Sequence, residues 1–433
     1  IDDMEEELIL TATEAKNRLI RGELSARELL EHCVARINAY EPQVEALAYW
    51  NLDDARRNAD ACDARKERGI LAGLPLGVKD IIDVSNMPTG CDSSLYTDYR
   101  PAADAACVAH IKANGGWVLG KTRTTEFAFS NPTSTRNPHS LRYTPGGSSS
   151  GSAAGVASGF FPLALGTQTG GSVIRPASYC GIYAFKPTFN VVSREGIKPL
   201  SENLDTLGWY GRSVEDLRLL NGALRGTNTE FLRTTPKRCT RIGLCRTPRW
   251  HQADNDMQRL VEDSADRLGA QEVELPDIFD QVYDDHSLIM AVDAARSLRA
   301  EYIRNADQLS SALIALIERG LKVAPNQELK AHQRLAQARE RLDALYGHYD
   351  ILLSPSAPGA APPSLETTGD SVFNRLWTAM QTPSISIPAG FSTTGMPLGI
   401  QLVGQRYADY SLLANASLIA EAIAVPLRQP AFA

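Results

Sequence analysis

Long apolar runs are missing from this 433-residue chain. No stretch reaches 18 apolar residues, which is about the length that a membrane-spanning helix requires. The first residues, 1–7, are mainly acidic, whereas a secretory leader begins with basic residues. These features predict a cytoplasmic protein that has no membrane partner.

Paired cysteines and metal-binding histidine motifs are also missing. The seven cysteines are an odd number at irregular spacing, and none forms a Cys-x-x-Cys pair. This usage is typical of reduced thiols rather than of a disulfide framework. The seven histidines include no i, i+4 pair around a glutamate, which is the pattern of zinc hydrolases. We therefore predict neither a metal nor another cofactor. The cysteines are Cys33, Cys62, Cys91, Cys107, Cys180, Cys239 and Cys245.

Clustered positive charge is the third missing feature. The 44 basic residues are outnumbered by 51 acidic ones, which gives a net charge of −7. Binding to nucleic acid depends on a basic patch that neutralises phosphates. The balance of charge therefore predicts no nucleic-acid partner. The 43% of hydrophobic residues supply enough apolar material for a large core.

A serine preceded by two glycines is the most informative feature that is present. It lies in the segment 166–188, GTQTGGSVIRPASYCGIYAFKPT, where Gly170 and Gly171 come directly before Ser172. Residues without a Cβ let the backbone turn sharply and direct several N–H groups at one point. The amides of Thr169, Gly170, Gly171 and Ser172 can then form an oxyanion hole for a carbonyl that Ser172 attacks. Taken alone, this sequence pattern is also typical of an ordinary glycine turn between strands.

Two further stretches carry residues of catalytic type. The first is PGGSSSGS at residues 145–152, and the second is an apolar run over residues 71–78 that leads to Lys79. A lysine at the end of such a run is delivered towards the interior, where lysines are rare. A surface lysine at the end of a strand is the alternative interpretation of Lys79.

Two motif matches compete with this interpretation. Residues 115–122, GGWVLGKT, have the spacing of a phosphate-binding P-loop, yet their bulky centre reads as a strand that follows a helix over residues 102–114. Residues 147–151, GSSSG, fit the nucleophile elbow of α/β-hydrolases, with Ser149 as nucleophile. The preceding residues 142–146 are not the apolar strand that an elbow requires. Both matches are therefore disfavoured, and Lys121 is expected to end a buried strand.

The three stretches together resemble the amidase signature family. That family combines a lysine after an apolar run, a GGSS segment and GT-x-T-GGS followed by Arg-Pro, and the resemblance returns at residues 353–358 and 395–404. Carried over residue by residue, it implies that Ser172 is the nucleophile, that Lys79 is the base, and that Ser148 follows a cis peptide bond and links the two. Lys79 must then be uncharged for a substantial fraction of the time at neutral pH, which burial can achieve.

The chain departs from the common family pattern at two places. Gln168 stands where many members have aspartate, and Ser172-Val173-Ile174-Arg175 is one residue longer than the usual serine-isoleucine-arginine. Arg175 then has two interpretations. Its guanidinium can hold the loop by binding carbonyls or a carboxylate such as that of Asp205. Alternatively, it can grip a substrate carboxylate, which would suit amides of short dicarboxylic acids.

The expected fold is α/β, with strands and helices mixed over a single domain of residues 1–433. The signature core covers about 70–215 and a variable helical region about 225–350. The resemblance implies a large central mixed β-sheet sandwiched between layers of α-helices, and often a homodimer. We expect helices over residues 9–40 (two, the second capped by Ser25 and Glu28), 51–68, 151–159, 293–305, 330–346 and 411–423, and one beginning at Ser213. Strands are expected near 348–355, 383–388 and 398–403.

The predicted function is hydrolysis of a carbon–nitrogen amide bond of a small molecule, with water as co-substrate, through an acyl-enzyme on Ser172. Esters and carbamates present the same carbonyl and are possible substrates. One alternative is an amidotransferase subunit that supplies ammonia from glutamine to a partner protein, although the variable region is short and shows no long apolar stretch for docking. An inactive scaffold protein is disfavoured because Lys79, Ser148 and Ser172 are all intact.

Overall fold

The computed structural model describes residues 9–67, 69–225 and 241–430, so Cys239 lies outside the described residues. Within these ranges the chain forms fourteen α-helices and eleven strands. The strands are β1 (Leu47–Trp50), β2 (Pro75–Lys79), β3 (Trp117–Thr122), β4 (Leu163–Gln168), β5 (Tyr183–Lys186), β6 (Thr206–Gly211), β7 (Ile242–Leu244), β8 (Gln271–Glu272), β9 (Ile351–Pro355), β10 (Ser384–Phe391) and β11 (Pro397–Gly404). The helices are α1 (Ala12–Arg21), α2 (Ala26–Val44), α3 (Leu52–Asp63), α4 (Ala106–Ala113), α5 (Ser150–Ser158), α6 (Ile174–Cys180), α7 (Val214–Arg225), α8 (Asn255–Leu268), α9 (Val282–Ser297), α10 (Arg299–Asn305), α11 (Ser311–Leu321), α12 (Pro325–Leu345), α13 (Val372–Ala379) and α14 (Asp409–Ile423).

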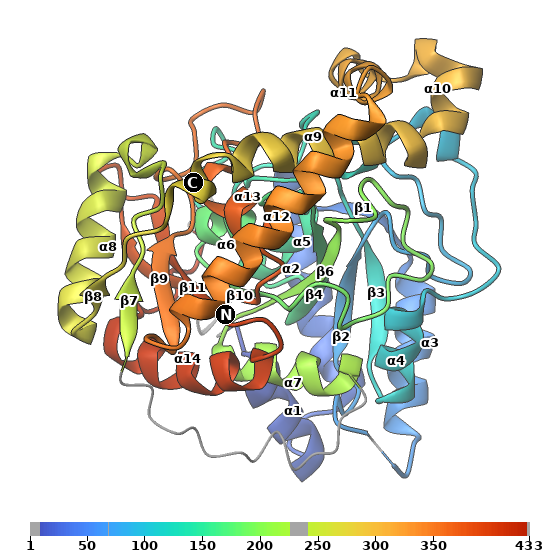
Figure 1. Cartoon of the computed structure of the whole chain (residues 1–433). Coiled ribbons are helices and arrows are strands. Elements are labelled where there is room, and N and C mark those ends of the chain that lie inside the picture. Colours follow the sequence, from blue (N-terminus) through green and yellow to red (C-terminus); the bar gives the residue numbers. More distant parts are fainter. Residues whose placement is uncertain (1–8, 68, 226–240, 431–433) are drawn as a thin grey trace.

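All eleven described strands belong to one mixed sheet. Their order is β1-β3-β2-β4-β6-β5-β10-β11-β9-β7-β8, and the sheet crosses the whole molecule in Figure 1. Strand β2 runs parallel to β3 and β4, and β7 runs parallel to β8 and β9, whereas the other neighbours are antiparallel. The predicted large mixed sheet is therefore confirmed.

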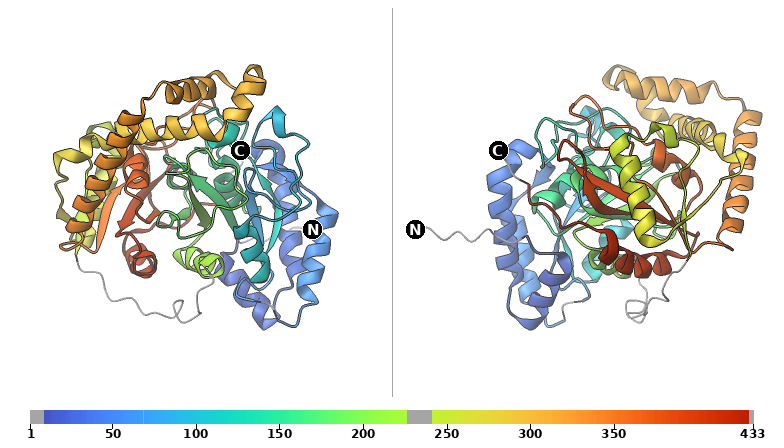
Figure 2. Two further views of the ribbon diagram at one scale, coloured as in Figure 1. Left: turned by 45° about the vertical axis from the view of Figure 1, so that its right-hand side comes forward. Right: turned by 90° about the vertical axis from the view of Figure 1, so that its left-hand side faces the viewer.

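Helices cover both faces of this sheet. Glycines 399 and 404 of β11 lie five residues apart and so face opposite sides. A Cβ on Gly399 would meet Ser178 of α6 at 3.2 Å, and one on Gly404 would meet Leu412 of α14 at 3.1 Å. Helix α5 packs beside α6, and α7 packs beside α14. The sheet thus lies between two helical layers, as predicted, and Figure 2 shows two further views of this arrangement.

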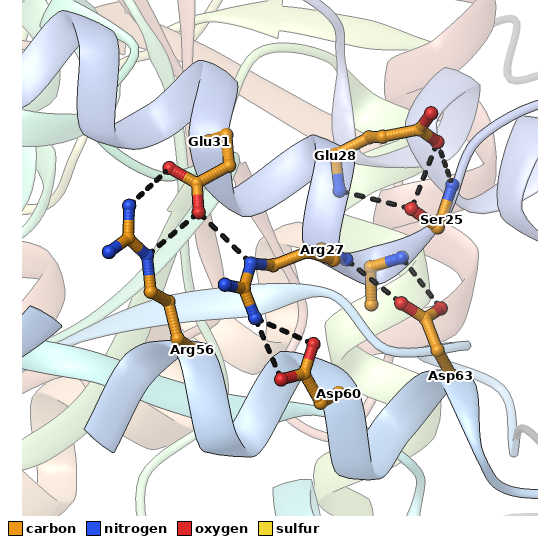
Figure 3. A network of polar contacts seen from close by, with 8 residues as sticks. Ser25, Arg27, Glu28, Glu31, Arg56, Asp60 and Asp63 are labelled. Atoms are coloured by element: carbon orange, nitrogen blue, oxygen red, sulfur yellow. Dashed lines mark hydrogen bonds and ion pairs between the residues drawn. The ribbon is translucent and has the colours of Figure 1, made fainter. Parts of the chain in front are cut away.

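Helices α2 and α3 are joined by a network of charged side chains, which Figure 3 shows from close by. Glu31 of α2 accepts hydrogen bonds from Arg27 and Arg56, and Arg27 also contacts Asp60 of α3 at 2.7 Å. The carboxylate of Asp63 accepts the amides of residues 26 and 27 at the start of α2. Because the side chains that bridge the two helices are about 40–60% exposed, each such pair adds at most about 1 kcal/mol to stability.

Most element predictions hold, and the errors lie at the ends of elements and at one break inside a predicted helix. The capping box of Ser25 and Glu28 is present at the start of α2. Helix α3 stops at Asp63 instead of continuing to residue 68. The helix expected over residues 293–305 is instead the end of α9 followed by α10, with a break at Leu298. Leu298 is fully buried, so the break coincides with the packing of this side chain. No glycine or proline in the sequence marks the break.

Of the helices that the structure describes, none combines the length and apolar character needed to cross a membrane. Within the same residues, no group of three or more His, Cys, Asp or Glu side chains is arranged to hold a metal ion.

Candidate active site

Lys79 lies at the end of β2, in the interior of the sheet. Its side chain is fully buried, which is consistent with the apolar run that precedes it and not with a surface position. Its Nζ lies 2.7 Å from Ser148 Oγ and 2.8 Å from Thr167 Oγ1. The predicted pairing of Lys79 with Ser148 is therefore present in the geometry.

The environment of Lys79 disfavours its charged form. Burial lowers the pKa of Lys79 from an ordinary value of 10.5 to about 7, although the charge of Asp205 acts in the opposite direction. The hydrogen-bond partners of the amine are two hydroxyl groups and, at 3.5 Å, the Thr167 carbonyl, and none of them is a carboxylate. A substantial fraction of Lys79 is then neutral at pH 7, which a general base requires.

Ser148 lies at the end of a loop, two residues before α5 begins at Ser150. The peptide bond between Gly147 and Ser148 is cis, as the sequence resemblance implied. The Ser148 side chain is buried, and its carbonyl accepts the amide of Thr125 at 3.1 Å. This loop presents the Ser148 hydroxyl to Lys79.

Ser172 lies between β4 and α6, where the chain turns out of the sheet. It is 8% exposed, more than the 1% of Ser148, and its carbonyl accepts the Tyr210 hydroxyl at 3.1 Å. Within the described residues, no hydrogen bond joins the Ser148 and Ser172 hydroxyls. The structure thus brings Lys79 and Ser148 into direct contact, whereas the second step of the predicted relay is not formed.

Hydrogen bonds from distant side chains to its carbonyl groups hold the loop before Ser172. His286 Nε2 lies 2.8 Å from the Thr169 carbonyl, and Thr378 Oγ1 donates to the Gly170 carbonyl at 2.8 Å. In the described part of the chain, the backbone amides of Gly170, Gly171 and Ser172 donate to no backbone or side-chain acceptor. Amides left unpaired in this way are available to an oxyanion.

Gln168 shows what the departure from aspartate changes. Its Oε1 accepts the amides of Val173 and Ile174, at 2.9 and 3.0 Å, and so caps the start of α6. Its Nε2 donates to Thr378 Oγ1 at 3.0 Å. An ionised aspartate could accept those amides but could not donate. The glutamine therefore links the capped helix to the threonine that holds Gly170.

Arg175 reaches back to the cis peptide bond. Its Nη2 donates to the Gly147 carbonyl at 2.6 Å and lies 3.3 Å from Thr368 Oγ1, and the side chain is buried. Asp205, the suggested carboxylate partner of Arg175, instead accepts Thr169 Oγ1 at 2.5 Å. The observed contact is with a carbonyl, as the loop-holding interpretation of Arg175 expects.

The P-loop match is excluded by the structure. Residues 117–122 are the buried strand β3, so its backbone pairs with β1 and β2 and cannot wrap a phosphate. Lys121 is fully buried, contacts Asp80 at 2.9 Å and donates to the Pro88 carbonyl at 2.8 Å. Lys121 therefore lies near the end of a buried strand, as predicted.

The nucleophile-elbow match is also excluded. Residues 142–149, all of which the structure describes, contain no strand. The Ser149 hydroxyl is buried and forms hydrogen bonds with the backbone of Thr167 in β4, at 3.2 and 3.3 Å. A serine fixed to a strand in this way is part of the packing and is not exposed for attack.

His286 and Thr378 are site residues that the sequence did not reveal. They come from α9 and α13, more than 100 residues beyond the glycine loop. Burial lowers the pKa of His286 to about 4, so its ring is neutral and donates from Nε2 to the Thr169 carbonyl. A lone histidine within a helix carries no motif that would indicate this contact.

Replacement of His286 tests its role in holding the oxyanion loop. We expect His286→Leu to lower kcat about tenfold, because losing one buried hydrogen bond costs about 1–2 kcal/mol and frees the Thr169 carbonyl to rotate. His286→Gln keeps a donor and should recover much of kcat. Steady-state kinetics on any hydrolysed amide provides the measurement. Equal kcat values for the two variants would contradict the role.

The chain is similar to known proteins over nearly its whole length. A family profile described as Amidase matches residues 28–413. The A subunit of the glutamyl-tRNA(Gln) amidotransferase of Halothermothrix orenii is 30% identical over 476 residues, which cover 97% of this chain and 98% of that protein. A solved structure described as an amidase superposes with a TM-score of 0.88 and 27% identity, covering 96% of this chain and all of the other. The native peptide amidase from Stenotrophomonas maltophilia superposes with a TM-score of 0.83 and 27% identity, covering 99% of each chain.

The profile spans most of the chain, and the similar proteins share both its length and its overall fold. The same span contains Lys79, Ser148 and Ser172. The chain therefore belongs to the amidase signature family.

Proposed function

We propose that this protein hydrolyses a carbon–nitrogen amide bond of a small molecule through an acyl-enzyme on Ser172. The observation that carries the proposal is the 2.7 Å contact between the buried Lys79 amine and the Ser148 hydroxyl. A neutral amine bonded to a hydroxyl can serve as a general base without histidine.

The proposed reaction moves protons along these three side chains. Neutral Lys79 takes the proton of Ser148 while Ser148 takes that of Ser172, whose Oγ bonds to the substrate carbonyl carbon. The amides of Gly170, Gly171 and Ser172, with that of Thr169, stabilise the resulting oxyanion. The relay then reverses to protonate the leaving nitrogen, and the C–N bond breaks. Water attacks the acyl-enzyme by the same route, and esters or carbamates would follow the same steps.

The remaining roles follow from the contacts. We assign Arg175 to the scaffold, because its guanidinium is already bound to the Gly147 carbonyl. We infer a cytoplasmic enzyme that acts with water and without a cofactor. A homodimer is the oligomeric state that the resemblance to the family suggests.

A subunit of an amidotransferase is the second candidate. The observation that favours it is the match to the glutamyl-tRNA(Gln) amidotransferase over 97% of the chain. The solved amidase and peptide amidase structures, which match over 96% and 99% of the chain at 27% identity, favour hydrolysis of free amides. The first candidate is preferred because it needs no partner protein.

A substrate panel with the purified chain distinguishes the two candidates. We expect the chain alone to hydrolyse at least one amide among aliphatic, aromatic and carboxylate-bearing substrates, carbamates and anilides, and to release ammonia from glutamine poorly. Gel filtration of the same sample would reveal any partner that copurifies. Efficient glutaminase activity that requires a second protein, with no turnover of the panel, would overturn the preference.

A further inference from the structure

The segment before α13 lies against both catalytic loops. A Cβ on Gly147 would meet the Thr368 side chain at 2.6 Å, and a Cβ on Gly171 would meet Ser371 at 2.9 Å. Residues 368–371 therefore span from the Ser148 loop to the oxyanion loop. The side chains that follow them border the place where the proposed function puts the substrate.

Arg375 is the charged residue of α13 at this border. Its Cγ lies 3.6 Å from the position that a Cβ on Gly170 would occupy. The side chain is 27% exposed and contacts Asp370, itself 54% exposed, at 2.9 Å. Its Nε is buried and, within the described residues, has no hydrogen-bond partner. Arg375 thus retains donor capacity beside the oxyanion loop.

A second guanidinium group, that of Arg249, belongs to the loop after β7. The Arg249 guanidinium stacks on the Tyr283 ring with 4.7 Å to its centroid, and Tyr283 lies one helical turn before His286, which holds the Thr169 carbonyl. Arg249 forms no ion pair among the residues that the structure describes. A partly exposed arginine with no carboxylate partner leaves unbalanced positive charge beside Tyr283.

The charges of the two arginines act on one common neighbour, Tyr283. Burial raises the pKa of the Tyr283 hydroxyl to about 12, and the charges of Arg249 and Arg375 both oppose that rise. The charge of Arg375 also adds to burial in lowering the pKa of His286. Arg249 therefore lies beside Tyr283, one helical turn from His286, and Arg375 lies beside Gly170 of the oxyanion loop.

We propose that Arg375 and Arg249 form a carboxylate-binding subsite, and that the substrate is an amide of a dicarboxylic acid whose second carboxylate is free. Arg375 would reach the carboxylate next to the oxyanion loop, and Arg249 would balance its remaining charge. The proposal rests on the proposed function. Arg375 takes the place of Arg175 as the residue that recognises an anionic substrate, because the Arg175 guanidinium is already bound to the Gly147 carbonyl.

The subsite is tested with pairs of substrates that differ in one charge. We would measure kcat/KM for succinamate and for its neutral analogue 4-oxopentanamide, and similarly for glutaramate and 5-oxohexanamide. Wild type should prefer the anionic member. In Arg375→Gln the ratio of anionic to neutral kcat/KM should fall about ten- to a hundredfold, since a charge-assisted hydrogen bond is lost. In Arg249→Gln it should fall by a smaller factor.

Two control variants separate recognition from general charge. Arg246 lies three residues before Arg249 and stacks on Trp250 at the same 4.7 Å, but it pairs with Glu262 and Glu272. Arg246→Gln should keep the ratio within about twofold of wild type. Asp370→Asn removes the carboxylate that competes for Arg375, so the ratio should stay equal or rise. An unchanged ratio in both Arg375→Gln and Arg249→Gln would overturn the subsite.

A binding measurement keeps the two proposals distinguishable. Calorimetric titration with succinate and glutarate, the dicarboxylate products, needs no turnover. We expect Arg375→Gln to weaken their binding at least tenfold relative to wild type. If wild type hydrolyses no amide but binds dicarboxylates through Arg375, the proposed function fails and the subsite stands. If wild type binds neither dicarboxylate, the subsite is wrong. It is also wrong if Arg375→Gln binds both dicarboxylates as tightly as wild type does.

Discussion

Ser172→Ala is expected to lower kcat by roughly 10⁴-fold or more, because removing a nucleophile abolishes the covalent route and leaves only binding and the oxyanion hole. The glycine loop is held by His286 and Thr378 and not by the Ser172 hydroxyl, so the variant should fold normally. Turnover of the best amide from the substrate panel provides the rate, and circular dichroism checks the fold.

Ser149→Ala is the matched control for this prediction. The Ser149 hydroxyl bonds the Thr167 backbone, so its loss should cost about 1 kcal/mol of stability and only a small part of kcat. If Ser149→Ala were inactive while Ser172→Ala kept more than a tenth of the wild-type rate, the nucleophile would be misassigned. The elbow interpretation would then return despite the missing strand.

Lys79→Met is expected to lower kcat/KM by about 10³-fold and to change its pH dependence, because a general base typically contributes 10²- to 10⁴-fold. In wild type only the neutral amine accepts a proton, so kcat/KM should rise with pH and level off above the pKa of about 7. The residual rate of Lys79→Met should lack this step. A wild-type profile that rises only near pH 10 would contradict the role.

Lys186 provides a matched control within the same sheet. Burial lowers its pKa to about 7 as well, but its Nζ donates to the carbonyls of Pro187 and Thr382 and not to a serine. Lys186→Met should therefore keep the midpoint of the kcat/KM profile near pH 7, even if the variant is less stable. If this variant moved the midpoint instead, the titrating group would not be Lys79.

The lowered pKa of Lys79 also predicts how the stability of the protein depends on pH. Between about pH 7 and 10.5 the folded protein holds Lys79 neutral while the unfolded chain holds it protonated, so the folded state binds fewer protons. The free energy of unfolding therefore gains from this group as pH rises through that window, by up to about 1.4 kcal/mol per pH unit. Lys79→Met should show a shallower rise, with the contribution of Lys186 remaining.

The sequence predicted the parts of the site that are continuous in the chain. Lys79 is buried at the end of its apolar run and contacts Ser148, which follows a cis peptide bond. Ser172 follows its two glycines, but within the described residues its hydroxyl forms no hydrogen bond with Ser148, so the triad stays a prediction. The large mixed sheet as a whole was implied only by the resemblance to the family, although its buried strands β9 to β11 also read as short apolar runs. These features depend on neighbours within a few residues.

The parts that the sequence did not reveal depend on distant contacts. His286, Thr378 and Arg375 come from α9 and α13 and reach the glycine loop only because the sheet brings those helices over it. Arg175 had two interpretations because its sequence neighbours do not show that the Gly147 carbonyl lies within reach. Such pairings across more than 25 residues are set by tertiary packing, which no local motif encodes.

Covalent labelling tests the central claim most directly. A fluorophosphonate probe reacts with an activated serine, and peptide mass mapping locates the labelled residue. We predict label on Ser172 in wild type, with a labelling rate that rises as pH passes about 7, and strongly reduced labelling in Lys79→Met. Label on Ser148 or Ser149 with Ser172 unmodified would contradict the account.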